Sequence, residues 1–286
     1  MLETYVGRAP AKLNLILEVT AKRPDGYHEV DTILQELELA DEVRLTLGLG
    51  HGVRVQGPFA RGVPRGKSNL ALQAASLLAV RLGRPEAAVT IDLVKNIPAA
   101  GGLGGGAADA VTVLRLLQGP WSASEGDVLA IANQLGSDEA FLLQGGTARA
   151  RGRGEQVERL PPLDRHGVVL FVPPATIEQK TARMFAALGR MPFDPGGVAD
   201  AFVTLETRSF TSCDAYNAFE RVAFDLFAGL HSLCSDLESR VGDAVRLCGA
   251  GPTLFWIGRS AAAARVAKAA AGADCTVILT ATASAH

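Results

Sequence analysis

Lysine is scarce in this chain of 286 residues, although basic residues as a class are not. Most of the 28 basic residues are arginine. Because arginine fills most surface roles, each lysine is a better candidate than usual for a specific task. The lysines are Lys12, Lys22, Lys67, Lys95, Lys180 and Lys268.

Cysteine and long apolar runs are also lacking. The four cysteines, Cys213, Cys234, Cys248 and Cys275, are widely spaced and form no C-x-x-C pair, which indicates reduced, buried thiols. The N-terminus lacks the pattern of a signal peptide, and no apolar run approaches the roughly 20 residues of a membrane span. We therefore expect a soluble, cytoplasmic protein.

The chain has no large excess of charge of either sign. Its formal net charge is -2 and its pI is near 6.2, which argues against general binding to nucleic acid or to a membrane surface. With 48% hydrophobic residues it can fill a core, which excludes a disordered chain. Small molecules are the expected partners.

Helix and strand patterns mix along the chain without regular alternation, which favours two α+β domains, 1–160 and 161–286, over a barrel or a doubly wound sheet. The Pro161-Pro162 pair marks the boundary. Strands are expected at 4–20 (one or two, interrupted near Pro10), 32–39, 43–47, 53–56, 89–94, just after 145–146, 168–172, 245–248, 253–257 and 275–279. Helices are expected from a cap at Ser68 or Asn69 to Arg81, at 107–117, at 125–135 after Ser122 or Ser124, and at 178–188, 214–230 and 261–271.

The glycine-rich stretch P-A-A-G-G-L-G-G-G-A-A-D, residues 98–109, follows an expected strand and opens an expected helix. Glycine lets successive backbone N-H groups approach an anion, and a helix start adds its positive dipole end. The motif alone fits a phosphate cradle and a tight strand-to-helix connection about equally well.

Known phosphate loops of other kinds fit poorly. Gly102, Gly104 and Ala107 satisfy G-x-G-x-x-A, but the acid that a dinucleotide site needs about 20 residues on falls at a helix start. The segment G-V-P-R-G-K-S, residues 62–68, is one residue short of a P-loop, so Lys67 is expected in solvent. The motif set of protein kinases is absent.

A Pro-x-x-x-Gly-Leu-Gly loop after a strand resembles the nucleotide loop of the GHMP kinases, the family of galactokinase, homoserine kinase and mevalonate kinase. P-A-K-L-N-L at residues 10–15 and G-A-G-P-T at 249–253 resemble two further motifs of that family, in the right order. The resemblance implies a two-domain α+β fold with an N-terminal ribosomal-protein-S5-like domain and a C-terminal ferredoxin-like domain. It also implies a small-molecule kinase that uses ATP with Mg²⁺.

The stretch R-P-D-G-Y-H-E, residues 23–29, resembles a signature of one branch of the family. That branch acts on a cytidyl sugar alcohol, 4-diphosphocytidyl-2-C-methyl-D-erythritol. The resemblance implies transfer of the ATP γ-phosphate to its 2-hydroxyl, a step of the non-mevalonate isoprenoid pathway. Two alternatives stay open: a GHMP kinase for another small alcohol, and an ATP- or metabolite-binding sensor without turnover. The protein is expected to be a monomer or a weak homodimer.

The same resemblance implies the roles of individual residues. Asp138 is the general base, Lys12 keeps it ionised, and Asn14 positions the substrate hydroxyl. The substrate-binding residues are Tyr27, which stacks on the cytosine, His28, which binds its edge, and Thr181 and Phe185. The ATP-binding residues are Lys95, Pro98, Ala99, Ala100, Gly101, Gly102, Leu103, Gly104, Gly105, Gly106, Ala107 and Ala108, and no side chain is assigned to a metal.

Several of these residues also have a plainer interpretation. By local sequence alone, Asp138 is a turn aspartate and Phe185 is more typical of a core residue. For Lys95, a solvated strand end explains the sequence about as well as a contact with a phosphate or the nucleotide. Asn217 is expected to be structural. Residues 249–251 are expected to back the site with bare backbone, and the plainer interpretation is a hairpin turn between Cys248 and Thr253.

The chain departs from the family pattern at four places: Ala107, Ala108 and Ala250 replace expected hydroxyl residues, and Glu139-Ala140 replaces Val-Pro.

Overall fold

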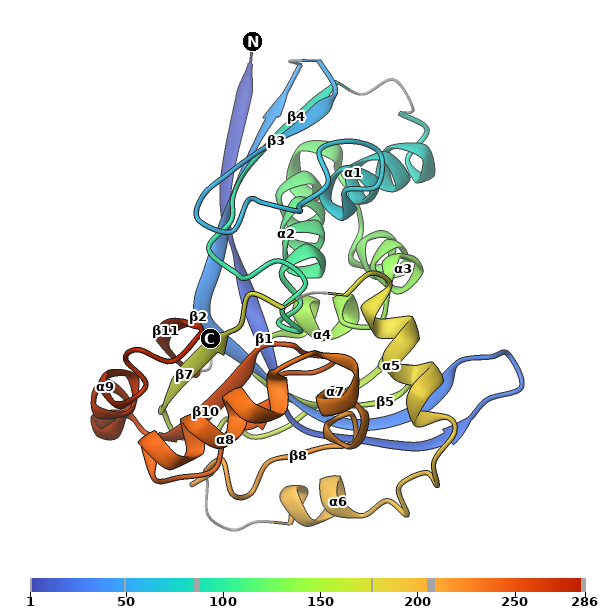
Figure 1. The fold of residues 1–286 in the computed structure, drawn as a ribbon. Coiled ribbons are helices and arrows are strands. Elements are labelled where there is room, and N and C mark those ends of the chain that lie inside the picture. Colours follow the sequence, from blue (N-terminus) through green and yellow to red (C-terminus); the bar gives the residue numbers. More distant parts are fainter. Residues whose placement is uncertain (1, 49, 85–87, 176, 205–208, 284–286) are drawn as a thin grey trace. The chain divides into compact units, whose positions relative to one another are not determined.

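Two long strands, β1 (Glu3–Lys22) and β2 (His28–Leu47), begin the chain in the computed structural model (Figure 1). The structure describes residues 2–48, 50–84, 88–175, 177–204 and 209–283. The chain forms two compact units, and both long strands contribute to each. Unit 1 consists of Met1–Lys12, Leu39–Ala99 and Gly104–Gln144, and unit 2 of Leu13–Glu38, Ala100–Leu103 and Gly145–His286. The predicted division at residue 160 stays a prediction.

Unit 1 combines a sheet with a group of helices (Figure 1). The strand order is β3-β4-β2-β1, with β3 parallel and β2 antiparallel to β4. Alternate residues of β4 are buried, and the helices α1, α2 and α3 pack on one another. The further elements of this unit are β3 (Gly52–Gln56), α1 (Leu70–Arg81), β4 (Val89–Val94), α2 (Gly105–Trp121), α3 (Glu125–Leu135) and α4 (Glu139–Gln144).

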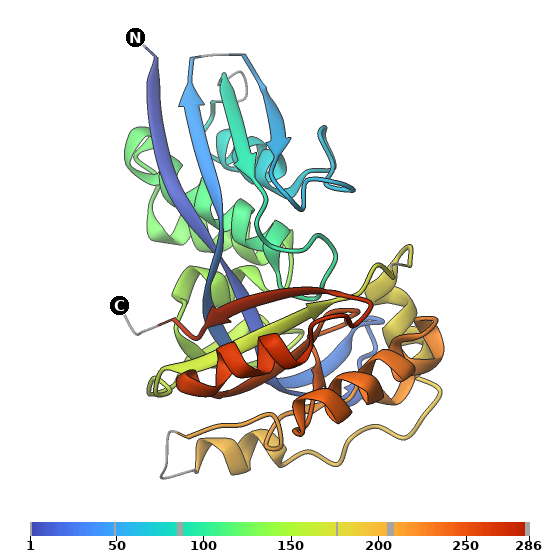
Figure 2. The ribbon, with the colours of Figure 1, turned by 60° about the vertical axis from the view of Figure 1, so that its left-hand side comes forward.

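Unit 2 contains strands in the order β6-β5-β2-β1-β8 and a separate antiparallel sheet in the order β11-β7-β10-β9. Helix α9 packs on β7, β10 and β11 of that second sheet (Figure 2). The strands are β5 (Thr147–Gly152), β6 (Gln156–Arg159), β7 (His166–Val172), β8 (Tyr216–Asn217), β9 (Arg246–Leu247), β10 (Leu254–Arg259) and β11 (Thr276–Ala281). The helices are α5 (Lys180–Leu188), α6 (Val198–Val203), α7 (Glu220–Leu226), α8 (Leu230–Val241) and α9 (Ser260–Ala269).

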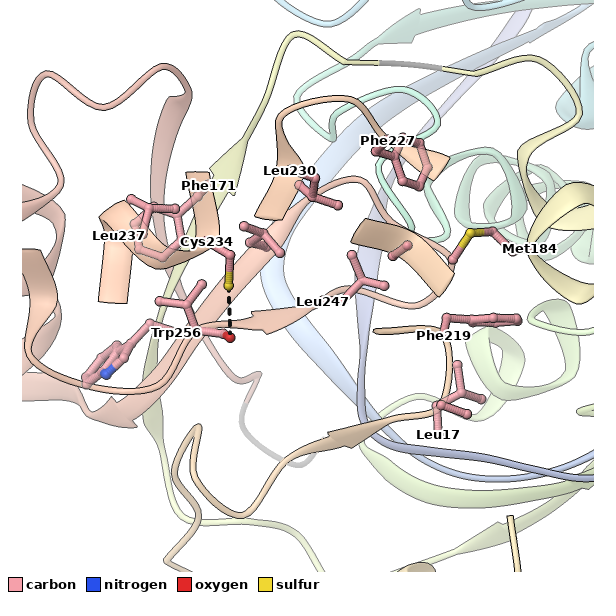
Figure 3. Packing of buried hydrophobic residues seen from close by; sticks show 14 of the residues in the cluster. Leu17, Phe171, Met184, Phe219, Phe227, Leu230, Cys234, Leu237, Leu247 and Trp256 are labelled. Carbon is pink, nitrogen blue, oxygen red and sulfur yellow. Dashed lines mark hydrogen bonds between the residues drawn. The ribbon is translucent and has the colours of Figure 1, made fainter. Parts of the chain in front are cut away.

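The core of unit 2 is apolar and draws on helices and strands alike (Figure 3). Phe171 of β7, Leu237 of α8 and Trp256 of β10 are 0%, 0% and 3% exposed. Cys234 lies in this core and its thiol donates to the carbonyl oxygen of Val245 at 3.7 Å. Burial raises the pKa of this thiol to about 12, so it stays protonated, as expected for a structural cysteine.

The expected α+β class is confirmed, and two local predictions are wrong. Strand β1 is not interrupted at Pro10. Among the described residues of unit 1, β1 is the last strand in the order, and the pairing of β8 with β1 is at Ile16 and Leu17. The missing N-H of Pro10 can therefore lie at the edge of this sheet. The two strands expected at 32–39 and 43–47 are likewise one strand, β2.

The single helix predicted at 214–230 is correct only over α7, Glu220–Leu226. Tyr216 and Asn217 instead form β8 beside β1, and α7 ends before Gly229. Gly229 has φ +77°, a left-handed conformation that favours glycine and separates α7 from α8. Helix α8 was not predicted.

None of the helices in the described ranges combines the length and the apolar character needed to cross a bilayer.

Candidate active site

The glycine-rich loop connects β4 to α2 and has the backbone of an anion cradle. Gly102 and Gly104 have φ +89° and +71°, and Gly104 precedes α2 without a side-chain cap. The first N-H groups of α2 are therefore not capped by the side chain before them, and the positive end of the helix dipole lies there. These features fit a phosphate or another anion.

Bare glycine backbone is required at Gly102 by a close contact within unit 2. A Cβ added to Gly102 would lie 2.1 Å from the carbonyl oxygen of Cys248. The segment Ala100–Leu103 thus lies directly against the turn between β9 and β10. The prediction of a hairpin turn at residues 249–251 is confirmed by the pairing of Leu247 with Leu254 and by the bond from the N-H of Gly251 to the carbonyl of Cys248, 2.7 Å.

Lys12 and Asp138 form an ion pair in unit 1, with 3.4 Å between the ammonium nitrogen and Oδ2. The Lys12 side chain is 7% exposed and that of Asp138 is 37% exposed. A Cβ added to Gly104 would lie 2.8 Å from Cγ of Lys12 and 3.7 Å from Oδ2 of Asp138. The structure therefore brings together the predicted base, its cation and the last loop residue before α2.

Glu139, next to Asp138, lies in a different environment. It is 3% exposed, and its carboxylate lies against Gly136, where an added Cβ would be 2.6 Å from Oε2. Burial, together with the charge of Asp138, raises the pKa of Glu139 to about 7. At neutral pH this buried carboxyl group is therefore partly protonated.

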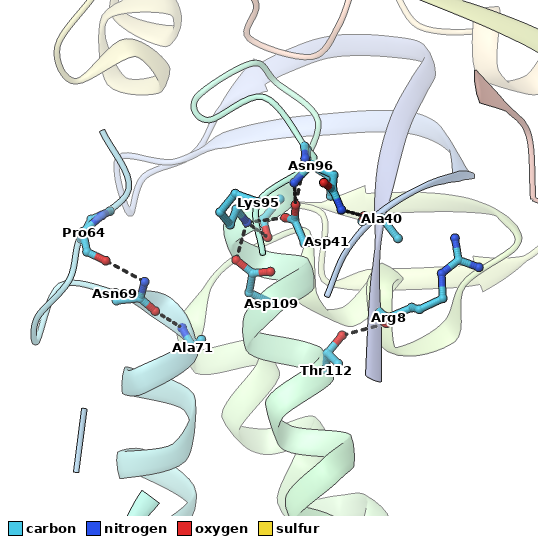
Figure 4. A network of polar contacts seen from close by, with 12 residues as sticks. Arg8, Ala40, Asp41, Pro64, Asn69, Ala71, Lys95, Asn96, Asp109 and Thr112 are labelled. Atoms are coloured by element: carbon cyan, nitrogen blue, oxygen red, sulfur yellow. Dashed lines mark hydrogen bonds and ion pairs between the residues drawn. The ribbon is translucent and has the colours of Figure 1, made fainter. Parts of the chain in front are cut away.

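Lys95 is the centre of a buried network in unit 1 (Figure 4). Its ammonium is bound to Asp41 and Asp109, and all three side chains are at most 3% exposed. Asp41 also accepts from the backbone N-H groups of Asn96 and Ile97, the latter at 2.8 Å. The interpretation of Lys95 as a solvated strand end is therefore wrong, whereas its role toward ATP stays a prediction.

Asp109 is buried together with Asp41, so two carboxyl groups share the single positive charge of Lys95. Its Oδ1 atom has no hydrogen-bond partner within the described part of the chain. Burial raises the pKa of Asp109 to about 7, against the lowering effect of Lys95. The sequence did not lead us to predict Asp41 or Asp109 as part of the site. For Asp109 a signal was available, because it lies one turn into the helix that follows the glycine-rich loop.

The residues predicted to bind the cytosine lie together in unit 2. The ring of His28 stacks on that of Phe185, with centroids 4.7 Å apart and planes 17° apart. Tyr27 is 54% exposed, and the Arg153 guanidinium lies 4.8 Å from its ring centroid. Thr181 is exposed, one turn before Phe185 on α5.

One ring nitrogen of His28 is buried and can still form a hydrogen bond. Within the described residues its Nε2 atom has no hydrogen-bond partner. Burial, and to a smaller extent the charge of Lys22, lowers the pKa of His28. The ring is thus favoured in its neutral form, in which one nitrogen donates and the other accepts.

Two asparagines of unit 2, Asn14 and Asn217, are buried, and their side chains donate hydrogen bonds. Asn14 donates to the hydroxyl of Thr32 at 2.8 Å, and it lies two residues after Lys12 on β1. Asn217 donates to the carbonyl oxygens of Leu247 and Gly249, both at 2.8 Å. Asn217 therefore supports the turn against which Gly102 lies, which agrees with the structural role expected for it.

The remaining loop residues differ in exposure. Among them, Ala99, Ala100 and Gly106 are exposed. Those buried are Pro98, Gly101, Leu103, Ala107 and Ala108, and Gly105 is intermediate. No group of three His, Cys, Asp or Glu side chains in the described ranges is placed to hold a metal ion.

The fold and the loop define the class of the protein. The family model described as "GHMP kinases N terminal domain" matches residues 69–146, which include the loop. A mevalonate kinase of Methanococcus jannaschii, 12% identical, shares the fold with a TM-score of 0.68 over 99% of each chain. The chain has the fold of the GHMP kinases, as its motifs predicted.

Closer relatives define the branch. The chain is 38% identical to the 4-diphosphocytidyl-2-C-methyl-D-erythritol kinase of Bacillus subtilis, over 87% of this chain and 86% of that protein. It is 37% identical to the enzyme of that name from Saccharopolyspora erythraea, over 93% and 87%. A crystal structure of 4-(cytidine 5'-diphospho)-2C-methyl-D-erythritol kinase, 33% identical, has a TM-score of 0.78 and covers 98% of this chain and 100% of that one. The chain belongs to the 4-diphosphocytidyl-2-C-methyl-D-erythritol kinase family of small-molecule kinases.

Proposed function

We propose that the protein transfers the γ-phosphate of ATP to the 2-hydroxyl of 4-diphosphocytidyl-2-C-methyl-D-erythritol, in the non-mevalonate isoprenoid pathway. The observation that carries the proposal is the Lys12–Asp138 ion pair beside Gly104. Phosphoryl transfer needs a group that accepts the hydroxyl proton, a cation, and donors to the phosphate oxygens. Unit 1 offers all three at the start of α2.

In this mechanism Asp138 accepts the proton of the 2-hydroxyl as its oxygen attacks the γ-phosphorus. The bond from the γ-phosphorus to the bridging oxygen breaks, and ADP leaves. Lys12 places its positive charge beside Asp138 and steadies the negative charge that develops during the transfer. The backbone N-H groups of the loop bind the phosphate oxygens. Mg²⁺ that arrives with ATP would neutralise further phosphate charge, and no side chain is assigned to it.

Recognition of the cytidyl group is assigned to unit 2. Tyr27 offers an exposed ring for stacking. Nε2 of the neutral His28 has no hydrogen-bond partner among the described residues, which supports its proposed bond to the cytosine edge. Phe185 orients His28 by stacking on it, and Thr181 is proposed as a further contact. Asn14 is proposed to position the hydroxyl. A monomeric or weakly dimeric state and a cytoplasmic location stay predictions.

The test is ATP-dependent phosphorylation of the cytidyl substrate with Mg²⁺, for the wild type and Asp138→Asn. Loss of a general base lowers kcat by a factor of about 10²–10⁴. Because the loop is unchanged, the dissociation constant for ATP should stay within about twofold. Asp225→Asn, on the exposed face of α7, is the matched control and should keep full activity.

Wild-type protein that binds ATP but does not phosphorylate the substrate would contradict the proposal and favour a nucleotide sensor. Transfer to another small alcohol instead would place the protein elsewhere among the GHMP kinases. Full activity in Asp138→Asn would remove Asp138 from the mechanism while leaving the reaction intact.

A further inference from the structure

Lys180, the first residue of α5, binds two backbone segments of unit 2 at once. Its ammonium donates to the carbonyl oxygen of Ala100 at 2.6 Å and also to that of Gly251. Ala100 belongs to the glycine-rich loop, and Gly251 to the turn between β9 and β10. Sequence analysis singled out Lys180 only as one of the scarce lysines.

The loop has no side-chain hydrogen bonds of its own to hold its conformation. Every residue from 97 to 108 is glycine, alanine, leucine, isoleucine or proline, so none has a side-chain hydrogen-bond donor. Ala100 nevertheless adopts φ +54°, a left-handed conformation that is unfavourable for alanine. Such a conformation persists only where the surroundings impose it. The bond from Lys180 to the Ala100 carbonyl is one such constraint.

The turn on the other side of Lys180 already contacts the loop. The N-H of Gly251 binds the carbonyl of Cys248 at 2.7 Å, and the same carbonyl leaves no room for a Cβ on Gly102. Lys180 therefore joins two segments that also touch at Gly102, and it fixes them at a second point.

We propose that Lys180 is a positioning residue of the nucleotide site, which binds the carbonyls of Ala100 and Gly251 and so holds the segment Ala100–Leu103 in the conformation that binds ATP. When only a fraction of a protein is in the binding-competent conformation, the apparent affinity falls by that fraction. Lys180 keeps this fraction high. The proposal rests on the proposed function only in taking ATP as the ligand.

The test compares Lys180→Met and Lys180→Arg with the wild type. Methionine keeps the aliphatic chain but cannot donate, so the dissociation constant for ATP, measured by calorimetry without cytidyl substrate, should rise about tenfold or more, the scale of a lost charge-assisted hydrogen bond. Arginine keeps charge and donors and should retain most of the affinity. In turnover assays KM for ATP should rise while kcat at saturating ATP changes less than about threefold.

A second substitution tests the role of Ala100. Glycine adopts positive φ without penalty, so adding Ala100→Gly to Lys180→Met should recover part of the lost ATP affinity. A role in overall stability would give no such recovery, and the melting temperature of Lys180→Met should stay near that of the wild type. Lys268→Met, an exposed lysine on α9, is the matched control and should bind ATP normally.

Unchanged ATP affinity in Lys180→Met, an equal loss in Lys268→Met, or no recovery with Ala100→Gly would each overturn the proposal. ATP binding is measured without the cytidyl substrate. A failure of the proposed reaction therefore leaves this test intact: the wild type would bind ATP, and only the turnover with that substrate would be missing. A wild type that binds no ATP would overturn the Lys180 proposal as well.

Discussion

Replacing Glu139 by glutamine removes a buried carboxyl group while nearly keeping its shape. Glu139 is 3% exposed on α4, and burial is the main cause that raises its pKa from 4.5 to about 7, with the charge of Asp138 as a second cause. A carboxyl group that is hard to ionise in the folded protein makes the free energy of unfolding depend on pH. Glutamine does not titrate and lacks this dependence.

The sign and size follow from the two pKa values. Below about pH 4.5 Glu139 is protonated in the folded and the unfolded chain, so its full contribution to stability is present. As pH rises toward 7, the unfolded chain releases the proton and the folded chain retains it, and the free energy of unfolding falls. Above pH 7 the loss is complete, at roughly 3 kcal/mol for a pKa that rises from 4.5 to about 7.

The assay is urea denaturation of the wild type and Glu139→Gln between pH 5 and pH 8.5. All other groups, Asp109 included, titrate in both proteins, so the difference between the two curves isolates Glu139. We expect Glu139→Gln to gain about 2 to 3 kcal/mol relative to the wild type across this range. Two curves that stay parallel would refute the shifted pKa and the reasoning from burial.

Two further predictions concern the loop and the network below it. Gly102→Ala should lower the melting temperature and weaken ATP binding, because its Cβ would lie 2.1 Å from the carbonyl oxygen of Cys248. Gly62→Ala is the control and should leave ATP binding unchanged, because Gly62 has a similar φ of +81° but no neighbouring atom of the described residues within 4 Å of an added Cβ. Lys95→Met should lower the free energy of unfolding by about 3–5 kcal/mol, because it leaves buried carboxylates without their cation. Adding Asp109→Asn should recover part of that loss in urea denaturation, and no recovery would contradict the network as drawn in Figure 4.

Elements defined by local signals could be predicted from the sequence. The alternating valines, isoleucine and leucine of β4 gave the right strand, since alternation directly reflects a half-buried strand. Helix α3 begins after Ser124, which forms a capping box with Asp127, and this pattern is visible within four residues. The glycine loop was likewise found because its chemistry is local.

Features that depend on distant partners could not be predicted in this way. Strand β8 is two residues long and exists because Tyr216 and Asn217 pair with β1, some 200 positions away. Local sequence around it favoured a helix. The partners of Lys95 come from 54 and 14 residues away. The pattern around Lys95 alone therefore left a solvated strand end as plausible as a contact with the nucleotide, and gave no sign of the buried network.

The scarcity of lysine has a structural counterpart at the loop. Lys12 lies against Gly104, Lys95 is bound beside Gly105, whose carbonyl is 3.4 Å from its ammonium, and Lys180 binds the carbonyl of Ala100. The other lysines, Lys22, Lys67 and Lys268, are exposed. A loop built only from small and apolar residues can present backbone N-H groups but no charge of its own. The cations that act on it must come from other elements, and in this chain a long flexible ammonium, rather than the arginine used elsewhere, occupies each of those three positions.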